Sequence, residues 1–497
     1  MKYVIGIDLG TSAVKAILVD RGGVVHKSLS RPYPLIIEKS GYSEQDPEHW
    51  YIKTKEIISE IIENFDGKKE DIEGISFSGQ MHGLVLLDKN YQVLRNAILW
   101  NDTRTTKQCR DINEVLSEKK LIEITKNQAL EGFTLPKLLW VKEHEKEIYN
   151  KIRYFLLPKD YLRFRISGTV EMDYSDAAGT LLLNISKKMW SDQIIDSFNL
   201  NKKIFPPLVE SYDCTGTVSE EFAKATGLST STRVFAGAAD NAAGAIGAGV
   251  LTEGKTICSI GTSGVILSYE SSSNKDYLGK VHYFNHGKEN AYYSMGVTLS
   301  AGYSLNWFQQ VFATGESITS LLDGIESIPP GANGLLFTPY LVGERTPHAD
   351  AIIRASFIGM DASHTKKHFT RSVIEGVTFS LRESLDIIRE KNDVSKIISI
   401  GGGSKNMVWL QMQADIFNTK VVKLTSEQGP ALGAAILAAV GCGWYSSLEE
   451  CSRVFISYEK SFTPNPSSVQ KYNQLYQLYK EVYQQTKKLN EGLHRFR

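Results

Sequence analysis

The fold is decided by the stretch Val4-Ile5-Gly6-Ile7-Asp8-Leu9-Gly10-Thr11-Ser12-Ala13-Val14-Lys15-Ala16-Ile17-Leu18-Val19, which predicts two apolar strands joined by a tight Gly-Thr-Ser turn. Past the middle of the chain, Thr256–Leu267 repeats this pattern with Ser259 at the position of Asp8. Backbone N–H groups and hydroxyls in such turns form small concavities that suit phosphate oxygens. We therefore expect two similar halves that hold one polyphosphate between them, with a metal position on the first half only.

A second repeated pattern supports an internal duplication. Residues 233–246 and 420–436 each read as a short apolar strand followed by a helix of small residues. Aligning Gly244 on Gly433 places Asp240 opposite Gly429, so the first half again carries an acid that the second half lacks. Two repeated pairs in the same order make a chance origin unconvincing. The first half is longer between these landmarks, and we expect this insertion to provide substrate selectivity.

Length and composition bound the class of protein. The chain has 497 residues, which suggests two or three domains, and its formal net charge is zero. A balanced charge gives no indication of binding to nucleic acid or to an anionic membrane. The five cysteines are scattered, and no leader precedes the first strand. These features predict a cytoplasmic protein without a disulfide framework or a zinc site.

Strands and helices alternate along the chain, with glycine turns at strand ends. This order predicts two α/β halves with a ligand in the cleft between them. We expect a boundary that divides the chain into domains 1–247 and 248–497. Glycines interrupt the apolar run over 247–254, and we expect the halves to hinge there.

With these patterns in view, the sequence resembles the FGGY family of carbohydrate kinases within the actin-like ATPase fold, and most closely the xylulokinases of that family. The resemblance covers nearly the whole chain. It rests on an ordered set of motifs, namely Ile5–Ser12, Ser43–Pro47, Ser78–Gly83, Leu99–Asp102, Leu157–Leu162, Ser175–Thr180, Ala239–Gly244, Gly261–Gly264, Pro339–His348 and Gly401–Gly403. No single stretch is decisive, but the ordered set is very specific.

The resemblance implies an α/β fold of two duplicated actin-like ATPase (ribonuclease H-like) domains flanking a cleft. The first domain would carry the sugar-binding insertion and the catalytic acid, and the second would mainly bind the nucleotide. The implied reaction is the ATP-dependent phosphorylation of D-xylulose to D-xylulose 5-phosphate. ATP and Mg²⁺ are the implied cofactors, a small-molecule sugar is the partner, and a homodimer is allowed.

Two acids are candidates for the chemistry of phosphoryl transfer, which needs a base on the acceptor hydroxyl and a metal on the phosphates. Asp240 suits the general base, because it opens a helix of small residues and could lie close to the sugar. The alternative role for Asp240 is to cap the N-terminus of this helix. The duplicate position is Gly429, which has no side chain, so a side-chain cap is not required there. Asp8 suits the metal, because a carboxylate beside a phosphate turn needs a cation between them.

The resemblance also implies the residues that bind the two substrates. The substrate-binding set is Gln80, Met81, His82, Asn101, Asp240 and Asn241. The nucleotide-binding set is Gly10, Thr11, Ser12, Gly261, Thr262, Ser263, Gly402, Gly403 and Asn406.

Two other functions stay open. A kinase for a related sugar, a pentitol or gluconate would share the acids and the glycine turns. The turn Gln80–Gly83 and the motif Glu44–Pro47 favour D-xylulose, although sugar choice rests on few side chains. An actin-like ATPase without a sugar substrate would hydrolyse ATP with a positioned water, and the insertion and Asp240 argue against it.

Overall fold

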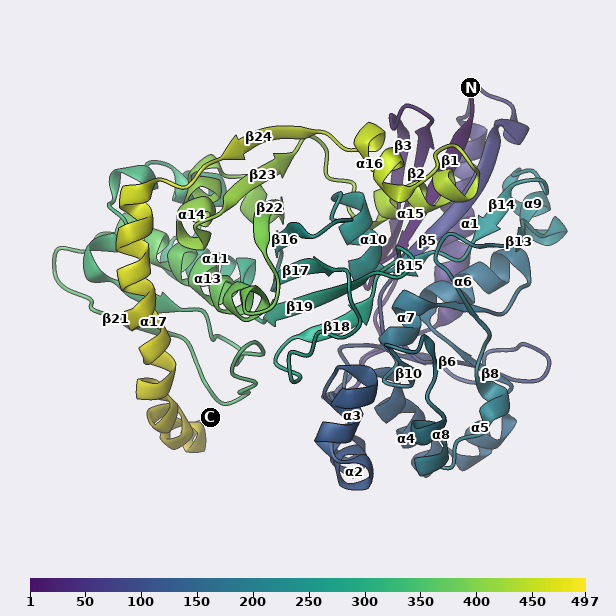
Figure 1. Cartoon of the computed structure of the whole chain (residues 1–497), viewed down its shortest axis with the longest axis horizontal. Coiled ribbons are helices and arrows are strands. Elements are labelled where there is room, and N and C mark those ends of the chain that lie inside the picture. The colour runs from purple at the N-terminus through teal and green to yellow at the C-terminus, as the bar shows by residue number, and fades with distance from the viewer.

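The computed structural model describes residues 1–497 and shows two large mixed sheets side by side (Figure 1). The first sheet has seven strands in the order β13-β14-β5-β1-β2-β3, with β15 also paired to β5. Its strands are β1 (Tyr3–Leu9), β2 (Ala13–Asp20), β3 (Val25–Pro32), β5 (Ile72–Gly79), β13 (Cys214–Thr217), β14 (Arg233–Phe235) and β15 (Ala238–Ala239).

The second sheet also has seven strands, in the order β18-β19-β17-β16-β22-β23-β24. Its strands are β16 (Gly254–Ile260), β17 (Gly264–Glu270), β18 (His282–Asn285), β19 (Tyr292–Thr298), β22 (Val394–Gly401), β23 (Lys420–Leu424) and β24 (Tyr458–Phe462).

The pairing of the strands confirms the predicted duplication. β1 pairs antiparallel with β2 and parallel with β5, and β16 pairs in the same way with β17 and β22. The register sets Asp8 opposite Ser78 and its counterpart Ser259 opposite Ile400. The predicted fold class, two duplicated α/β domains of the actin-like ATPase type flanking a cleft, is confirmed.

The insertion of the first half lies below its sheet in Figure 1 and consists mainly of short helices and two-stranded pairs. The helices of the first half before α10 are α1 (Pro47–Glu63), α2 (Thr106–Leu116), α3 (Glu118–Thr125), α4 (Thr134–His144), α5 (Lys146–Lys151), α6 (Pro158–Ser167), α7 (Tyr174–Ala178), α8 (Asp192–Ser197) and α9 (Glu220–Thr226). The short strands are β4 (Glu44–Gln45), β6 (Val85–Leu87), β7 (Ala97–Ile98), β8 (Tyr154–Leu156), β9 (Met172–Asp173), β10 (Leu183–Asn184), β11 (Met189–Trp190) and β12 (Leu208–Val209).

Helices of the second half cover its sheet, and the long helix α17 runs along the outer side of that lobe (Figure 1). Four tyrosines of α17, at positions 472, 476, 479 and 483, are buried, as the aromatic spacing of this segment indicates. The helices of this lobe are α11 (Gly302–Phe312), α12 (Ile318–Leu322), α13 (Lys366–Arg389), α14 (Met407–Phe417) and α17 (Pro466–Leu493), with strands β20 (Leu336–Thr338) and β21 (Ser356–Ile358). α16 (Leu448–Phe455) instead packs against α15 and α10.

The two repeated helices, α10 (Asp240–Gly247) and α15 (Pro430–Gly441), pack against each other at the centre of the molecule. A Cβ atom at Gly433 would overlap the carbonyl oxygen of Ala243, so the backbones touch where the glycine lies. α15 also lies on the first sheet, where a Cβ at Gly6 would overlap the carbonyl oxygen of Ala431. A helix that follows the second sheet in sequence thus packs on the first.

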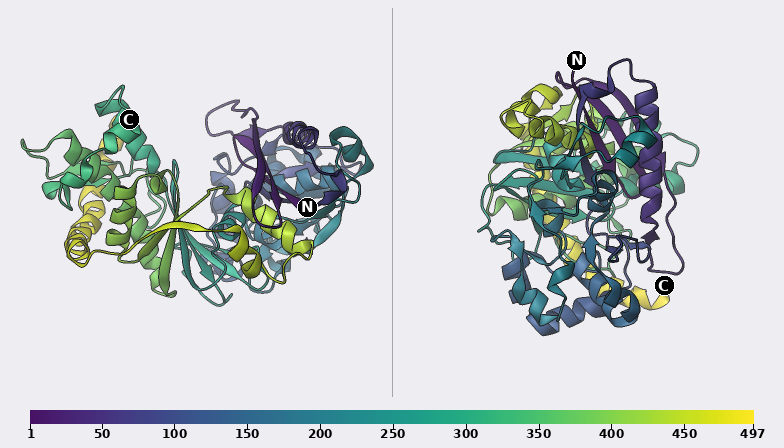
Figure 2. Two further views of the ribbon diagram at one scale, coloured as in Figure 1. Left: turned by 90° about the horizontal axis from the view of Figure 1, so that it is seen from above. Right: turned by 90° about the vertical axis from the view of Figure 1, so that its right-hand side faces the viewer.

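Because α15 and α16 lie on the first half, the chain crosses between the halves more than once. It crosses from α10 to β16, returns after β23 to α15, and crosses again from α16 to β24, as the yellow segment in the left view of Figure 2 shows. All strands of the first sheet precede residue 247 and all strands of the second follow residue 248. The boundary at this position stays a prediction.

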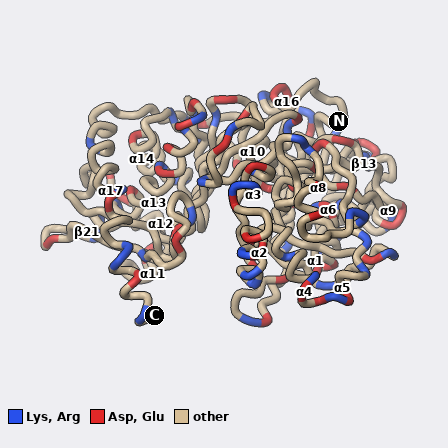
Figure 3. The backbone as a smooth tube through the Cα atoms, turned by 60° about the horizontal axis from the view of Figure 1, so that its bottom comes forward, with Lys and Arg blue, Asp and Glu red and all other residues tan.

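Charges of both signs are interspersed over both halves (Figure 3). None of the helices is both long and apolar enough to span a membrane. All five cysteines are free, and Cys214 is the exposed one.

Candidate active site

The two predicted acids lie at the same edge of the first sheet. Asp8 is the second-last residue of β1, before the Gly-Thr-Ser loop, and lies opposite Ser78 of β5. β15 pairs with β5 at Ser78 and Gly79, and Asp240 follows β15 directly. Because β1, β5 and β15 are parallel, their carboxyl ends bring both carboxylates to one place, the position where α/β proteins bind ligands.

Asp240 begins α10, but the N-cap of that helix is Ala239. The Asp240 carboxylate accepts the backbone N–H of Asn241 at 2.7 Å and its side-chain amide at 3.0 Å. Burial, together with the nearby negative charge of Asp8, raises the pKa of Asp240 to about 7. A carboxyl group that titrates near neutral pH is suited to accept and release a proton.

Asp8 accepts a hydrogen bond from the hydroxyl of Ser78 at 3.0 Å through Oδ1, and burial raises its pKa. It lines a cavity of about 320 Å³ between the two halves. Lys15, on the same wall, reaches across the halves to the side-chain oxygen of Gln428 at 2.8 Å. The remaining residues of this cavity are Gly244, Gly247, Ala248, Ser259, Ile400, Gly401, Leu424, Glu427 and Gly429.

The two predicted phosphate turns both join antiparallel strands, but the first is one residue longer than the second. The N–H of Gly10 donates to the carbonyl of Ala13 at 3.1 Å, and that of Gly261 donates to the carbonyl of Ser263 at 3.0 Å. Ser12, Gly261, Thr262 and Ser263 are exposed, whereas Gly10 and Thr11 are half-buried. Thr11 accepts the indole N–H of Trp100 at 2.9 Å, so the first turn is tied to the insertion.

The glycine segment after β22 is partly structural. Gly402 is exposed, but Gly403 is buried where a Cβ would lie 2.5 Å from Cδ1 of Ile260. Asn406 is the N-cap of α14 and accepts the N–H of Trp409 at 3.0 Å. The side-chain oxygen of Asn406 is therefore engaged in capping, which limits it to donating from its amide.

A second cavity, of about 240 Å³, brings together four of the predicted substrate-binding residues, Met81, His82, Asp240 and Asn241. Its other residues are Trp100, Leu130, Gly132, Phe133, Ser263, Val265, His282, Met295, Val297 and Arg345. Gln80 and Asn101 are not among its lining residues. The amide of Gln80 donates to Gln45 at 3.0 Å, and Asn101 accepts from the hydroxyl of Ser43 at 2.8 Å.

His82 presents a defined face to this cavity. Its backbone is left-handed, with φ of 69°, and its Nδ1 lies 2.5 Å from the carbonyl oxygen of Gly179. A carbonyl only accepts, so we assign the ring proton to Nδ1, and Nε2 is then an acceptor. Burial lowers the pKa of His82 to about 3, so the ring is neutral. Nε2 of the neutral ring can accept a hydrogen bond from a sugar hydroxyl.

Several cavity residues were missed from the sequence, and Arg345 is the most informative. It lies in the motif Pro339–His348, which pointed to the family without indicating a role for the arginine. Its neighbours Glu344 and Thr346 fix the segment to β19, because Glu344 accepts the N–H of Leu299 at 3.1 Å and Thr346 accepts that of Val297 at 3.1 Å. Trp100 and Phe133 come from the insertion and could not be located without the fold.

Comparison with known proteins agrees with this arrangement. Residues 3–247 match the N-terminal domain of the FGGY family of carbohydrate kinases, and residues 256–442 match its C-terminal domain. The chain is 60% identical over 498 residues to the xylulose kinase of Bacillus subtilis (strain 168), with 100% of both chains covered.

Two solved structures from Lactobacillus acidophilus have similar folds. One is described as a ligand-bound xylulose kinase and the other as a gluconate kinase. Each superposes with a TM-score of 0.93 at 30% identity, covering 98% of both chains.

Proposed function

The chain belongs to the FGGY family of carbohydrate kinases, and from this premise we propose that it transfers the γ-phosphoryl group of ATP to D-xylulose, yielding D-xylulose 5-phosphate. The observation that carries the proposal is the cavity in which Asp240, Asn241, Met81 and His82 meet. It joins a group that can accept a proton to groups that can orient a polyol. Asp8 lines the other cavity, between the two halves.

In the proposed mechanism, Asp240 is the general base. Its carboxylate accepts the proton of the O5 hydroxyl as the oxygen attacks the phosphorus, and releases it to solvent after product leaves. The amide of Asn241 donates to Asp240 and also lies 3.5 Å from the sulfur of Met81. Its side-chain oxygen is then left to accept from a sugar hydroxyl, while Nε2 of His82 accepts from another.

ATP is the phosphoryl donor of this family, and the cavity between the halves suits its phosphates. Glycines 244, 247, 401 and 429 line that cavity and leave backbone open to a ligand, and Lys15 places a cation on its wall. Gly261, Thr262 and Ser263 would face the β- and γ-phosphates, and Gly402 would border the adenosine.

Asp8 fits the requirements of a Mg²⁺ ligand. Its Oδ1 accepts from Ser78, its Oδ2 has no protein partner, and it faces the cavity that we assign to the phosphates. Mg²⁺ is usually held by one or two carboxylates together with phosphate oxygens and water. Bound there, the ion would neutralise charge that develops on the phosphates during transfer.

Gluconate is the second candidate substrate. A solved gluconate kinase is as similar to this chain as the solved xylulose kinase, and Arg345 places a guanidinium at the sugar cavity. A guanidinium binds a carboxylate with two parallel hydrogen bonds, and it can also donate to the carbonyl oxygen of a ketose. The 60% identity to a xylulose kinase over the whole chain favours D-xylulose.

The test is coupled detection of ADP with a panel of D-xylulose, related ketoses, pentitols and gluconate. The proposal expects D-xylulose to give the highest kcat/KM. A higher value for gluconate would transfer the assignment to the second candidate. ATP turnover that is the same with and without every sugar would favour an ATPase and contradict both. Pairing as a homodimer and a place in the cytoplasm stay predictions.

A further inference from the structure

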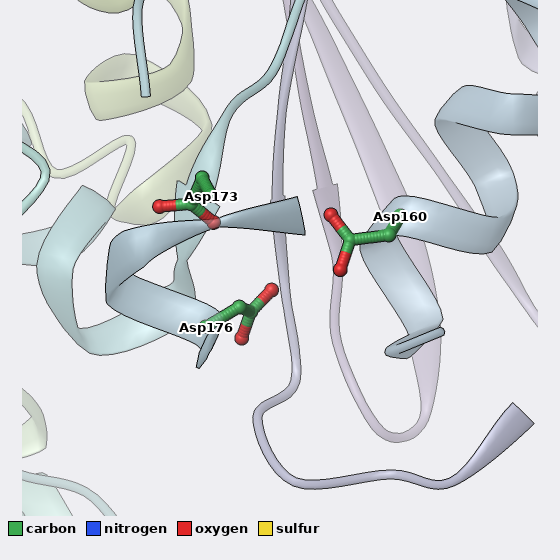
Figure 4. A group of neighbouring side chains, drawn as sticks. All are labelled: Asp160, Asp173 and Asp176. Atoms are coloured by element: carbon green, nitrogen blue, oxygen red, sulfur yellow. The ribbon is translucent and has the colours of Figure 1, made fainter. Parts of the chain in front are cut away.

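A buried ionic cluster joins Lys159 to three aspartates, Asp160, Asp173 and Asp176, and Figure 4 shows how the three aspartates lie. The Nζ of Lys159 lies 2.6 Å from Asp160, 2.9 Å from Asp173 and 3.3 Å from Asp176. All four residues have no exposed surface. The three carboxylates have the spacing of a metal site, but the lysine ammonium already supplies the positive charge among them. The cluster therefore has a role other than holding a metal ion.

The cluster connects to the backbone in front of Asp240 through one serine. Oδ2 of Asp173 accepts the hydroxyl of Ser175 at 2.5 Å and its backbone N–H at 2.9 Å. The oxygen of that hydroxyl accepts the N–H of Ala239 at 2.9 Å. Because the Ser175 hydroxyl donates its hydrogen bond to Asp173, its oxygen is free to accept from Ala239, the residue that precedes Asp240.

Lys159 holds the carboxylate in this orientation. It binds the other oxygen of Asp173, and it also lies 3.4 Å from the carbonyl of Ala236, in the segment that leads to Asp240. Ser211 adds a third hydrogen bond to Oδ2 of Asp173, at 2.8 Å. Lys159, Asp173, Ser175 and Ser211 are all buried, and hydrogen bonds between buried polar groups favour one conformation.

The same short helix also holds the sugar-facing histidine. Ser175 lies in the first turn of α7, and Gly179 follows the end of that helix. The carbonyl of Gly179 accepts the Nδ1–H of His82, as described above. One element of five residues thus fixes both the start of the segment that carries Asp240 and the ring of His82.

We propose that Ser175 is a positioning residue, which holds Asp240 through the N–H of Ala239 and sets its separation from His82 through α7. This inference rests on the proposed function, in which Asp240 is the base and His82 binds the sugar. Loss of the hydroxyl would free the Ala239 peptide and leave its N–H unpaired in a buried place. Misplacement of a reacting group by about 1 Å can lower a rate by about 10²-fold.

The test compares Ser175→Ala and Ser175→Cys with the wild-type protein in steady-state assays with D-xylulose. Both variants should lower kcat by about 10- to 100-fold and leave KM for ATP unchanged. The cysteine fills the space of the serine but is a weak acceptor, so a packing effect alone would leave it active. Ser372→Ala is the matched control, because Ser372 is equally buried and bonds only to the carbonyl of Phe369, far along the chain in α13.

A second readout is the pH dependence of kcat/KM. Burial and the negative charge of Asp8 raise the pKa of Asp240, and Arg345, His82 and His282 line the same cavity. If Asp240 moves toward water, burial raises its pKa less, so the acid limb should shift to lower pH in both Ser175 variants and not in the Ser372 control.

A value of kcat and an acid limb equal to those of the control, in either folded Ser175 variant, would overturn the inference. Asp240→Ala is assayed in parallel. If Asp240→Ala stays active, the assignment of the base fails. If it is inactive while Ser175→Ala is normal, only the positioning role fails.

Discussion

At the scale of single residues, the proposed chemistry depends on the pair Asp8 and Asp240. Asp8 lies at the carboxyl end of β1 and Asp240 directly follows β15, and β5 pairs with both of these strands. Burial and, to a smaller extent, the negative charge of Asp8 raise the pKa of Asp240 to about 7. A cation bound at Asp8 would oppose this effect, so metal binding and proton transfer are linked.

Asp8→Asn tests that linkage. Removing the charge of Asp8 removes a repulsion that disfavours ionised Asp240, so the pKa of Asp240 should fall. Activity requires the unprotonated base, and the acid limb of kcat/KM should therefore move to lower pH. The variant should also need a higher Mg²⁺ concentration for half-maximal rate. Overlapping Mg²⁺ titrations for the variant and the wild type would make Asp8 a structural residue.

The predicted substrate-binding residues that line one cavity come from short, distinctive segments, and their role stays a prediction. Met81 and His82 follow a strand end, and Asp240 and Asn241 open a helix, so local patterns located them. Gln80 shares the same motif, but its side-chain amide donates to Gln45 and it does not line the cavity. Neighbours along an irregular turn point in different directions, which a motif does not reveal.

At the scale of elements, the duplication was readable because strand and turn patterns repeat with matching acids and glycines. What could not be read is the exchange of helices, in which α15 follows the second sheet but packs on the first. Small residues in α15 indicated close packing without naming the partner. Arg345 and His282 reach the sugar cavity from the second half for the same reason, since only the assembled fold brings them there.

Gly433→Ala tests the contact between the repeated helices. The added methyl group would overlap the carbonyl oxygen of Ala243 and force α10 and α15 apart. Overpacking of this kind costs about 1–3 kcal/mol or more, so the midpoint of thermal unfolding should fall by several degrees. Gly492→Ala is the control, because nothing lies within 4 Å of its Cβ position in α17. Equal midpoints for the two variants would show that the helices separate without strain.

At the scale of the whole molecule, the halves are joined by three crossings rather than by the single segment 247–254 that the sequence suggested. Gly249 and Gly254 have left-handed φ values of 75° and 82°, and Gly429, at the second crossing, has φ of 62°. We expect closure to turn about all three crossings. The insertion also bonds to the second half, where Asn127 donates to the carbonyl of Tyr283 at 2.8 Å.

Closure of the cleft is expected to accompany substrate binding, because a kinase must keep water from the phosphoryl group. The radius of gyration from solution scattering should decrease with D-xylulose and decrease further with a non-hydrolysable ATP analogue. An unchanged radius, in a preparation that is active in the same buffer, would limit the motion to a small loop.

The most direct test of the account is the rate of ADP formation by the intact protein with and without D-xylulose, for the wild type and for Asp240→Asn. The exchange keeps the size of the side chain and removes its ability to accept a proton. The account predicts that D-xylulose stimulates the wild type strongly and that kcat of the variant is lower by about 10²- to 10⁴-fold, the usual range for loss of a general base. An Asp240→Asn protein that is stimulated by D-xylulose as strongly as the wild type would contradict it.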